Sequence, residues 1–198
     1  MAPGDRTDEH QRRAVIHTAA IREFSVRGFT GTSMANIADA AGMSRPALYL
    51  YFDNKAAIFA SAFAALMDDA VDRALAALAQ PGSVADQLQG FLQRFDGDLW
   101  EQMAASPHSQ EILSAKYEHA AGATQPALDR RRRGLGAYLR RTGASTSLRS
   151  GWMELLDLSP KGFKLDQPTV AVYRSRLTTL ARSVAADIEQ ARTAAVNS

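Results

Sequence analysis

Residues 34–51 read MANIADAAGMSRPALYLY, and this stretch decides which fold the sequence predicts. Ala38 is small where two helices must cross closely, and Gly42, four residues later, suits the left-handed backbone of a tight turn. Leu48 follows six residues after Gly42 on the expected buried face of a second helix, and Ile37 extends the same apolar seam. This spacing predicts a helix-turn-helix, a unit that places the N-terminal part of its second helix in the major groove of DNA.

Further helices are expected on both sides of this stretch. Apolar residues recur at helical spacing, Gly and Pro separate the periodic segments, and strand-like alternation is absent from the sequence. Three of the helices have a suitable cap, which is either Thr32 or Ser33 for the first, Ser44 for the second and Asp53 for the third. Residues 159–162 (SPKG) predict a loop. The expected helices span about 9–27, 32–41, 44–50, 53–79, 84–103, 106–122, 126–143, 148–158 and 168–195. The predicted class is all-α.

Composition limits the function classes. The chain has 198 residues, 23 basic against 21 acidic side chains and a formal net charge of +2, so any contact with DNA must come from local placement of charge. The absence of cysteine excludes disulfides and thiolate metal sites, and it fits a cytoplasmic protein. The polar N-terminus does not resemble a secretory signal, and the longest apolar stretch is too short for a membrane span, so no membrane partner is expected.

The motif resembles a known family. The residues that carry the likeness lie at fixed spacing between about Arg12 and Phe59. They are Gly28-Phe29, Thr32-Ser33-Met34, Ile37-Ala38, Ala41-Gly42-Met43-Ser44, Leu48-Tyr49, Tyr51-Phe52 and Lys55. Together they resemble the TetR family of bacterial regulators. The resemblance implies an N-terminal three-helix DNA-binding domain and a C-terminal helical domain for ligand binding and dimerisation.

The DNA-contacting residues are expected at two helix starts and just beyond. Thr32 and Ser33 lie where free N–H groups favour a phosphate, and Arg45 can offer a bidentate fork to guanine. Tyrosine phenols and the Lys55 ammonium suit phosphate oxygens, although the tyrosines could also be half-buried packing residues. The full predicted DNA-binding set is Thr32, Ser33, Ser44, Arg45, Pro46, Ala47, Tyr49, Tyr51 and Lys55. The resemblance implies the same roles, although Pro46 is less common there than a longer side chain.

The expected domain organisation has three parts: a disordered tail over 1–8, the DNA-binding domain over 9–55, and a ligand-binding and dimerisation domain over 56–198. In the last part, aromatic and methionine side chains at helical spacing predict either ordinary core or the lining of an apolar ligand pocket. The candidate pocket residues are Phe63, Met67, Phe91, Phe95, Trp100, Met103, Tyr117 and Trp152. The expected effector is a small apolar or amphipathic molecule.

The last helix carries a narrow apolar stripe, which is typical of a helix-pairing seam. The predicted dimer contacts are Tyr173, Leu177, Leu180, Val184 and Ile188. Packing within one subunit is the alternative interpretation. The run Arg130–Arg133 predicts a solvated face with one arginine turned inward, because four successive helical residues point in different directions. A second anion contact is the alternative.

Enzymatic and metal chemistry are not indicated. His108 and Glu111 share a helical face, but a metal site needs three or four ligands and the other histidines lack complementary spacing. No phosphate-binding glycine loop or nucleophile motif occurs, so neither catalytic residues nor a cofactor are expected.

The sequence thus predicts a homodimeric repressor that binds a palindromic operator in double-stranded DNA and responds to a ligand. Two alternatives stay open: a TetR-like protein that acts through protein partners without an inducer, and a helical-bundle enzyme or carrier. A pocket of a few hundred Å³ among the central helices would favour the ligand-responsive repressor over the protein that acts without an inducer.

Overall fold

The computed structural model describes residues 3–196, and these residues form helices joined by short turns, with no strand among them. The predicted all-helical class is confirmed. The elements in chain order are α1 (Pro3–Gly31), α2 (Met34–Ala40), α3 (Arg45–Tyr49), α4 (Lys55–Ala77), α5 (Val84–Leu92), the π-helix η1 (Gln93–Gly97), α6 (Asp98–Ala104), α7 (Ser109–Ala115), the π-helix η2 (Lys116–Ala120), α8 (Ala121–Arg140), α9 (Thr146–Gly162) and α10 (Val170–Val196). No helix within 3–196 combines the length and apolarity that a membrane span requires.

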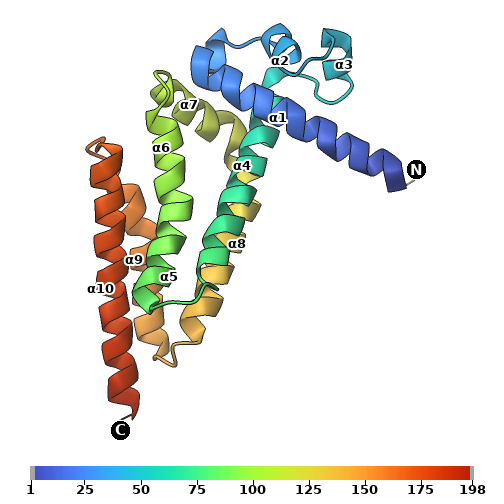
Figure 1. Ribbon diagram of the computed structural model, residues 1–198. Coiled ribbons are helices and arrows are strands. Elements are labelled where there is room, and N and C mark those ends of the chain that lie inside the picture. The colour runs from blue at the N-terminus through green and yellow to red at the C-terminus, as the bar shows by residue number, and fades with distance from the viewer. Residues whose placement is uncertain (1–2, 197–198) are drawn as a thin grey trace. The chain divides into compact units, whose positions relative to one another are not determined.

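Helices α2 and α3 form the predicted helix-turn-helix beside α1 (Figure 1). Gly42 has φ +66°, the left-handed conformation that closes α2. The amide of Met43 donates to the carbonyl of Ala38 at 3.0 Å and that of Gly42 to Asp39 at 3.1 Å, which together make a Schellman motif. Ala38 and Leu48 are buried, so α3 is anchored by its inner face.

The chain divides into two compact units. The first unit runs to Asp68 and also includes Ala105–Gln125, and the second consists of Asp69–Ala104 and the chain from Pro126 onward. This division differs from the expected boundary at residue 55, because α7 packs with α1 inside the first unit. The expected tail over 1–8 also differs, since α1 begins at Pro3; residues 1–2 lie outside the described part.

The core of the first unit is aromatic. Phe59 on α4 lies at its centre, with its ring centroid 4.9 Å from that of Phe24, 5.2 Å from Phe29 and 4.4 Å from Phe63. Phe24 and Phe59 are fully buried. At about 1.5–3 kcal/mol for each large buried apolar side chain, this cluster is a main source of stability for the helices that position α2 and α3.

The second unit is built around α5, η1 and α10, and α10 runs alongside α5 in Figure 1. Leu88 and Phe91 on α5 and Leu177 on α10 are buried in it. Helix α8 approaches α4 closely at Gly134, where an added Cβ would lie 2.4 Å from a methyl carbon of Leu75.

Two expected breaks in the helices are absent. Helix α9 continues to Gly162 through the predicted SPKG loop, and α8 runs through Gly122 and Pro126 instead of beginning at Pro126. Pro160 forfeits one helical hydrogen bond, but its ring is buried and its carbonyl accepts a 3.0 Å hydrogen bond from the hydroxyl of Tyr173. This packing compensates for the lost bond and holds the last turn of α9.

Candidate nucleic-acid interface

The leading turn of α3 is exposed and rigidly held. Ser44 caps the helix, with its Oγ accepting from the amide of Ala47 at 3.3 Å, and Pro46 occupies the first turn, where a missing N–H does no harm. Ser44, Arg45 and Pro46 are exposed, Ala47 is half-buried and Leu48 is fully buried. The expected residues therefore share one end of α3, and their side chains are free to meet a ligand while the helix stays fixed.

Arg45 and Tyr49 lie one turn apart and form a pair on this surface. The Nη2 of Arg45 is 3.4 Å from the Tyr49 hydroxyl, and its guanidinium carbon is 5.7 Å from the centre of the phenol ring. Tyr49 is 42% exposed, whereas Tyr51 is half-buried. Tyr49 thus restrains the arginine without covering it, which reduces the entropy that Arg45 would lose on binding a base.

Thr32 and Ser33 precede α2, but their hydroxyls have partners within the chain. Thr32 is buried and its hydroxyl donates to the carbonyl of Gly28 at 2.7 Å. Ser33 forms a capping box: its Oγ accepts from the amide of Asn36 at 3.2 Å, and the Asn36 Oδ1 accepts from the Ser33 amide at 3.0 Å. Of the two, only Ser33 presents an exposed side chain.

The side-chain ammonium of Lys55 contacts backbone carbonyls of its own chain. Its Nζ donates to the carbonyls of Phe29 (2.7 Å), Thr30 (3.2 Å) and Thr32 (2.9 Å) and lies 4.7 Å from the centre of the Phe29 ring. All three ammonium hydrogens are therefore engaged with carbonyls between α1 and α2. The observed contacts give Lys55 an intramolecular role, and its expected contact with a DNA phosphate stays a prediction. Helix α4 is capped by Asn54, whose Oδ1 accepts from Ala57 at 2.8 Å, instead of by Asp53.

Glu111, which the sequence offered only as a candidate metal ligand, binds the backbone of α1. Its Oε1 accepts from the amide of Thr30 at 2.6 Å, and this hydrogen bond holds the pKa of the Glu111 carboxyl below its usual value. Gly28 has φ +73°, and an added Cβ there would lie 2.1 Å from the Glu111 Oε2. A residue with a side chain at position 28 would be strained at this φ and would displace the Glu111 carboxylate. The sequence gives no signal for the contact, because 81 residues separate Thr30 from Glu111.

Comparison with known proteins identifies this substructure. The family described as bacterial regulatory proteins, tetR family, matches residues 16–62, which contain most of α1, the helix-turn-helix and the start of α4. Residues 16–62 are thus similar to the DNA-binding region of the TetR family. The match includes the capped and exposed turn of α3, so the geometry and the family agree on the same surface.

Two curated relatives each match about a quarter of the chain. The HTH-type transcriptional regulator YdgC of Bacillus subtilis is 52% identical over 50 residues, which are 25% of this chain and 26% of that protein. The HTH-type transcriptional regulator TtgR of Pseudomonas putida is 41% identical over 56 residues, 28% of this chain and 27% of that protein. The chain thus aligns with about a quarter of the length of these relatives.

The likeness of fold extends further than the likeness of sequence. A TetR-family transcriptional regulator from Mesorhizobium loti superimposes with a TM-score of 0.60 at 19% identity, covering 90% of this chain and 96% of that one. The helical fold of this neighbour is therefore shared over most of the chain, including the part outside residues 16–62.

The candidate effector-pocket residues are divided between the two units. Phe63, Met67 and Tyr117 belong to the first unit, where Tyr117 is 70% exposed. The others, Phe91, Phe95, Trp100, Met103 and Trp152, belong to the second unit. There the indole N–H of Trp152 donates to Asp187, which ties α9 to α10. An effector contact for this set stays a prediction.

The predicted dimer seam lies inside the subunit. Tyr173, Leu177, Val184 and Ile188 are at most 3% exposed within the single chain, and Leu180 is half-buried. Helix α10 packs against α5, η1 and α9, so these four residues form a seam within one subunit, as the alternative interpretation expected; a dimer contact at Leu180 stays a prediction.

The arginine run behaves as predicted, with one arginine turned inward. Arg131 is buried between the rings of Phe91 and Phe95, and it pairs with Asp96 at 2.9 Å and Asp157 at 3.0 Å. Asp96 lies on the π-helix η1, whose irregular turn carries this carboxylate in the core of the second unit. The network links α8, η1 and α9 within the second unit.

Proposed function

We propose that the protein is a ligand-responsive transcriptional repressor that binds a palindromic operator in double-stranded DNA as a homodimer. The observation that carries the proposal is the leading turn of α3, which is capped by Ser44, anchored by Leu48 and exposed at Arg45 and Pro46. A helix fixed on its inner face and free at its N-terminal end has the geometry of a recognition helix.

Arg45 is the proposed base-reading residue. Its guanidinium can donate to both acceptors of a guanine edge in the major groove, and Tyr49 holds it close to the helix. Ser33, Ser44 and the tyrosine hydroxyls are the proposed phosphate partners, and Pro46 and Ala47 could contact a thymine methyl group. Thr32 and Lys55 are left out because their polar atoms already bond to backbone carbonyls.

Helix α9 is the proposed dimer surface in place of the α10 seam. Leu148, Leu155 and Leu158 are 41%, 49% and 50% exposed, and Gly151 and Gly162 are exposed as well. These five residues recur at steps of three and four, so they form one stripe with the heptad spacing of paired helices. We call it the α9 stripe. A second copy of the chain is the proposed occupant, since a palindromic operator requires two-fold symmetry.

The proposed response to a ligand is a population shift. A small molecule with higher affinity for a dimer whose recognition helices are badly spaced would release the operator.

The proposed location of the protein is the cytoplasm. The alternative function is an operator-binding protein that acts through a protein partner without an inducer. It would have the same DNA-binding features and would differ only in lacking the response to a ligand.

Selection of binding sites from random duplex DNA tests the DNA-binding proposal. The purified wild-type protein should enrich an inverted repeat. Arg45→Ala should lose discrimination at one base pair in each half-site, at a cost of about 1–3 kcal/mol, because one bidentate contact is removed. Arg133→Ala is the matched control, since Arg133 is an exposed arginine in the second unit. Enrichment of no sequence, or an unchanged preference in Arg45→Ala, would contradict the assignment.

A further inference from the structure

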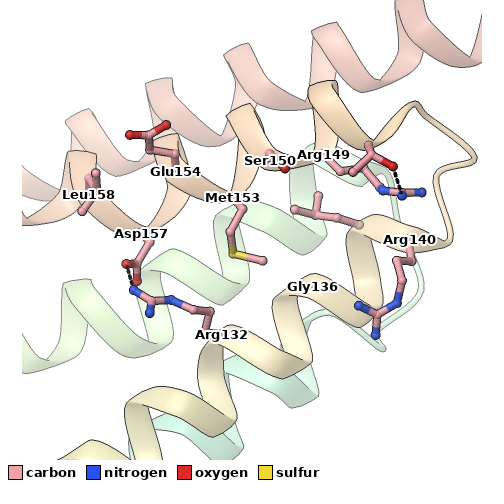
Figure 2. A pocket seen from close by; sticks show the side chains of 11 residues that line it. Arg132, Gly136, Arg140, Arg149, Ser150, Met153, Glu154, Asp157 and Leu158 are labelled. Carbon is pink, nitrogen blue, oxygen red and sulfur yellow. Dashed lines mark hydrogen bonds and ion pairs between the residues drawn. The ribbon is translucent and has the colours of Figure 1, made fainter.

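A groove of about 450 Å³ lies between α8 and α9 of the second unit, and Figure 2 shows it from close by. None of the aromatic residues proposed above for the effector pocket lines it. Its walls combine apolar side chains, including Leu139 and Met153, with the arginines Arg132, Arg140 and Arg149. Its volume falls within the range of small-molecule sites, about 300–1,000 Å³.

Gly136 makes room for the groove. It lies inside the 20-residue helix α8, where glycine costs about 1 kcal/mol relative to alanine. A Cβ at this position would lie 3.3 Å from the Met153 Cε and 3.6 Å from the Arg140 Nη1, so a larger side chain would fill the space between the two helices. The glycine therefore leaves an apolar floor open beside a guanidinium.

Two of the arginines lack an acidic partner. Among residues 9–194, whose side chains the structure describes, no ion pair engages Arg140, and the Nη2 of Arg149 donates only to the hydroxyl of Thr146, at 3.0 Å. By contrast, Arg132 pairs with Asp157 at 2.6 Å. One end of the groove thus carries two positive charges that no carboxylate neutralises.

The two acidic residues of the lining do not offset these charges. Asp157 is already paired with Arg131, Arg132 and Lys161. Burial would raise the pKa of its carboxyl, but the hydrogen bonds from Arg132 and Lys161 outweigh that effect and lower it. Glu154 lies at the rim, and Figure 2 shows its carboxylate extending away from Met153 and Gly136.

We propose that this groove binds a small amphipathic anion, whose carboxylate, sulfonate or phosphate group pairs with Arg140 and Arg149 while its apolar part lies over Gly136 and against Met153. Guanidinium groups bind such oxyanions through two parallel hydrogen bonds. The flexible thioether of Met153 can adjust to the shape of an apolar chain. The same lining disfavours a cation, which would meet two uncompensated positive charges.

Calorimetric titration of the full-length protein without DNA tests the proposal, with octanoate and octylamine as a matched pair of probes. Octanoate should bind at one site per chain, and octylamine at least ten-fold more weakly. The double variant Arg140→Gln/Arg149→Gln should weaken octanoate binding by ten-fold or more, whereas Arg133→Gln, which changes an exposed arginine of α8 outside the groove, should leave it unchanged.

Gly136→Leu provides a second variant, which should block octanoate while all charges remain. If this variant fails to fold, as judged by circular dichroism, the arginine variants decide alone, because Arg140 is exposed and Arg149 half-buried. Equal binding of the amine, absence of octanoate binding, or unchanged affinity in the double variant would overturn the proposal. Since no DNA is present, these outcomes are independent of operator binding.

Discussion

Lys55 makes contacts within the subunit that the proposed DNA surface depends on. Its ammonium bridges three carbonyls at the junction of α1 and α2. Lys55→Ala should therefore lower the free energy of unfolding by about 1 kcal/mol, because partly buried carbonyls lose a charged donor. Urea unfolding measures this loss. The slope of log affinity against log salt for operator binding should stay unchanged; a slope reduced by about one, at unchanged stability, would instead restore the phosphate contact.

His17 predicts a pH dependence of stability. Burial lowers its pKa, Arg13 adds to the shift, and the ring nitrogen Nε2 lies 2.9 Å from the Ser61 hydroxyl. Because the folded protein binds the proton less readily than the unfolded chain, the contribution of His17 is present above the unfolded pKa of about 6.5 and is lost as pH falls through the folded value.

Thermal unfolding between pH 7.5 and 5.0 checks this expectation. The wild-type melting temperature should fall across this range more than that of His17→Gln, whose amide keeps a hydrogen-bonding group near Ser61 but does not titrate. Parallel curves for the two proteins would show that His17 does not cause the pH dependence.

The residues of the turn in the helix-turn-helix were predictable because each obeys a local rule. Gly42 supplies a left-handed backbone and Ser44 a cap, and both effects act within a few residues. Lys55 and Glu111 were not predictable in the same way, since their partners are 23–26 and 81 residues away. The charge of a lysine near a helix start suits a phosphate and a carbonyl equally well.

At the scale of the elements, the exposed stripe on α9 predicts the effect of a single charge. Leu155→Arg should give monomers in analytical ultracentrifugation, because burying an unpaired arginine in a helix pair is costly. Operator affinity should fall with dimerisation. Leu165→Arg is the matched control, since Leu165 is 86% exposed and lies beyond the C-terminal end of α9. An intact Leu155→Arg dimer would remove the α9 stripe from the interface.

The spacing of apolar residues predicted where the helices lie better than it predicted which helices pack against each other. The stripe on α10 indicated that one face of this helix is covered, but a stripe of the same spacing serves an internal seam and an intersubunit seam alike. Pro160 shows a second limit: a proline usually ends a helix, yet a buried ring and the hydrogen bond from Tyr173 retain it inside α9. Both outcomes depend on tertiary contacts that local patterns do not record.

For the whole molecule, the near balance of charge has a consequence for DNA binding. With a formal net charge of +2, general attraction to DNA is weak, so the affinity of the proposed dimer should depend on the correct spacing of its two recognition helices. The proposed dimer should need half-sites about 34–36 Å apart. Inserting five base pairs at the centre of the selected operator should reduce affinity at least ten-fold, because the half-sites then face opposite sides of the duplex. Gel-shift titration would measure this, and equal affinity for both operators would argue against simultaneous use of the two half-sites.

The first compact unit is assembled from two stretches of chain, one ending at Asp68 and the other spanning Ala105–Gln125. A gene fusion that joins residues 1–68 to a foreign sensor domain would leave behind α7, and with it Glu111, the partner of Thr30. A working chimera must import both stretches and replace only what lies between and after them. A single crossover behind the helix-turn-helix would likewise separate α7 from its packing partner α1.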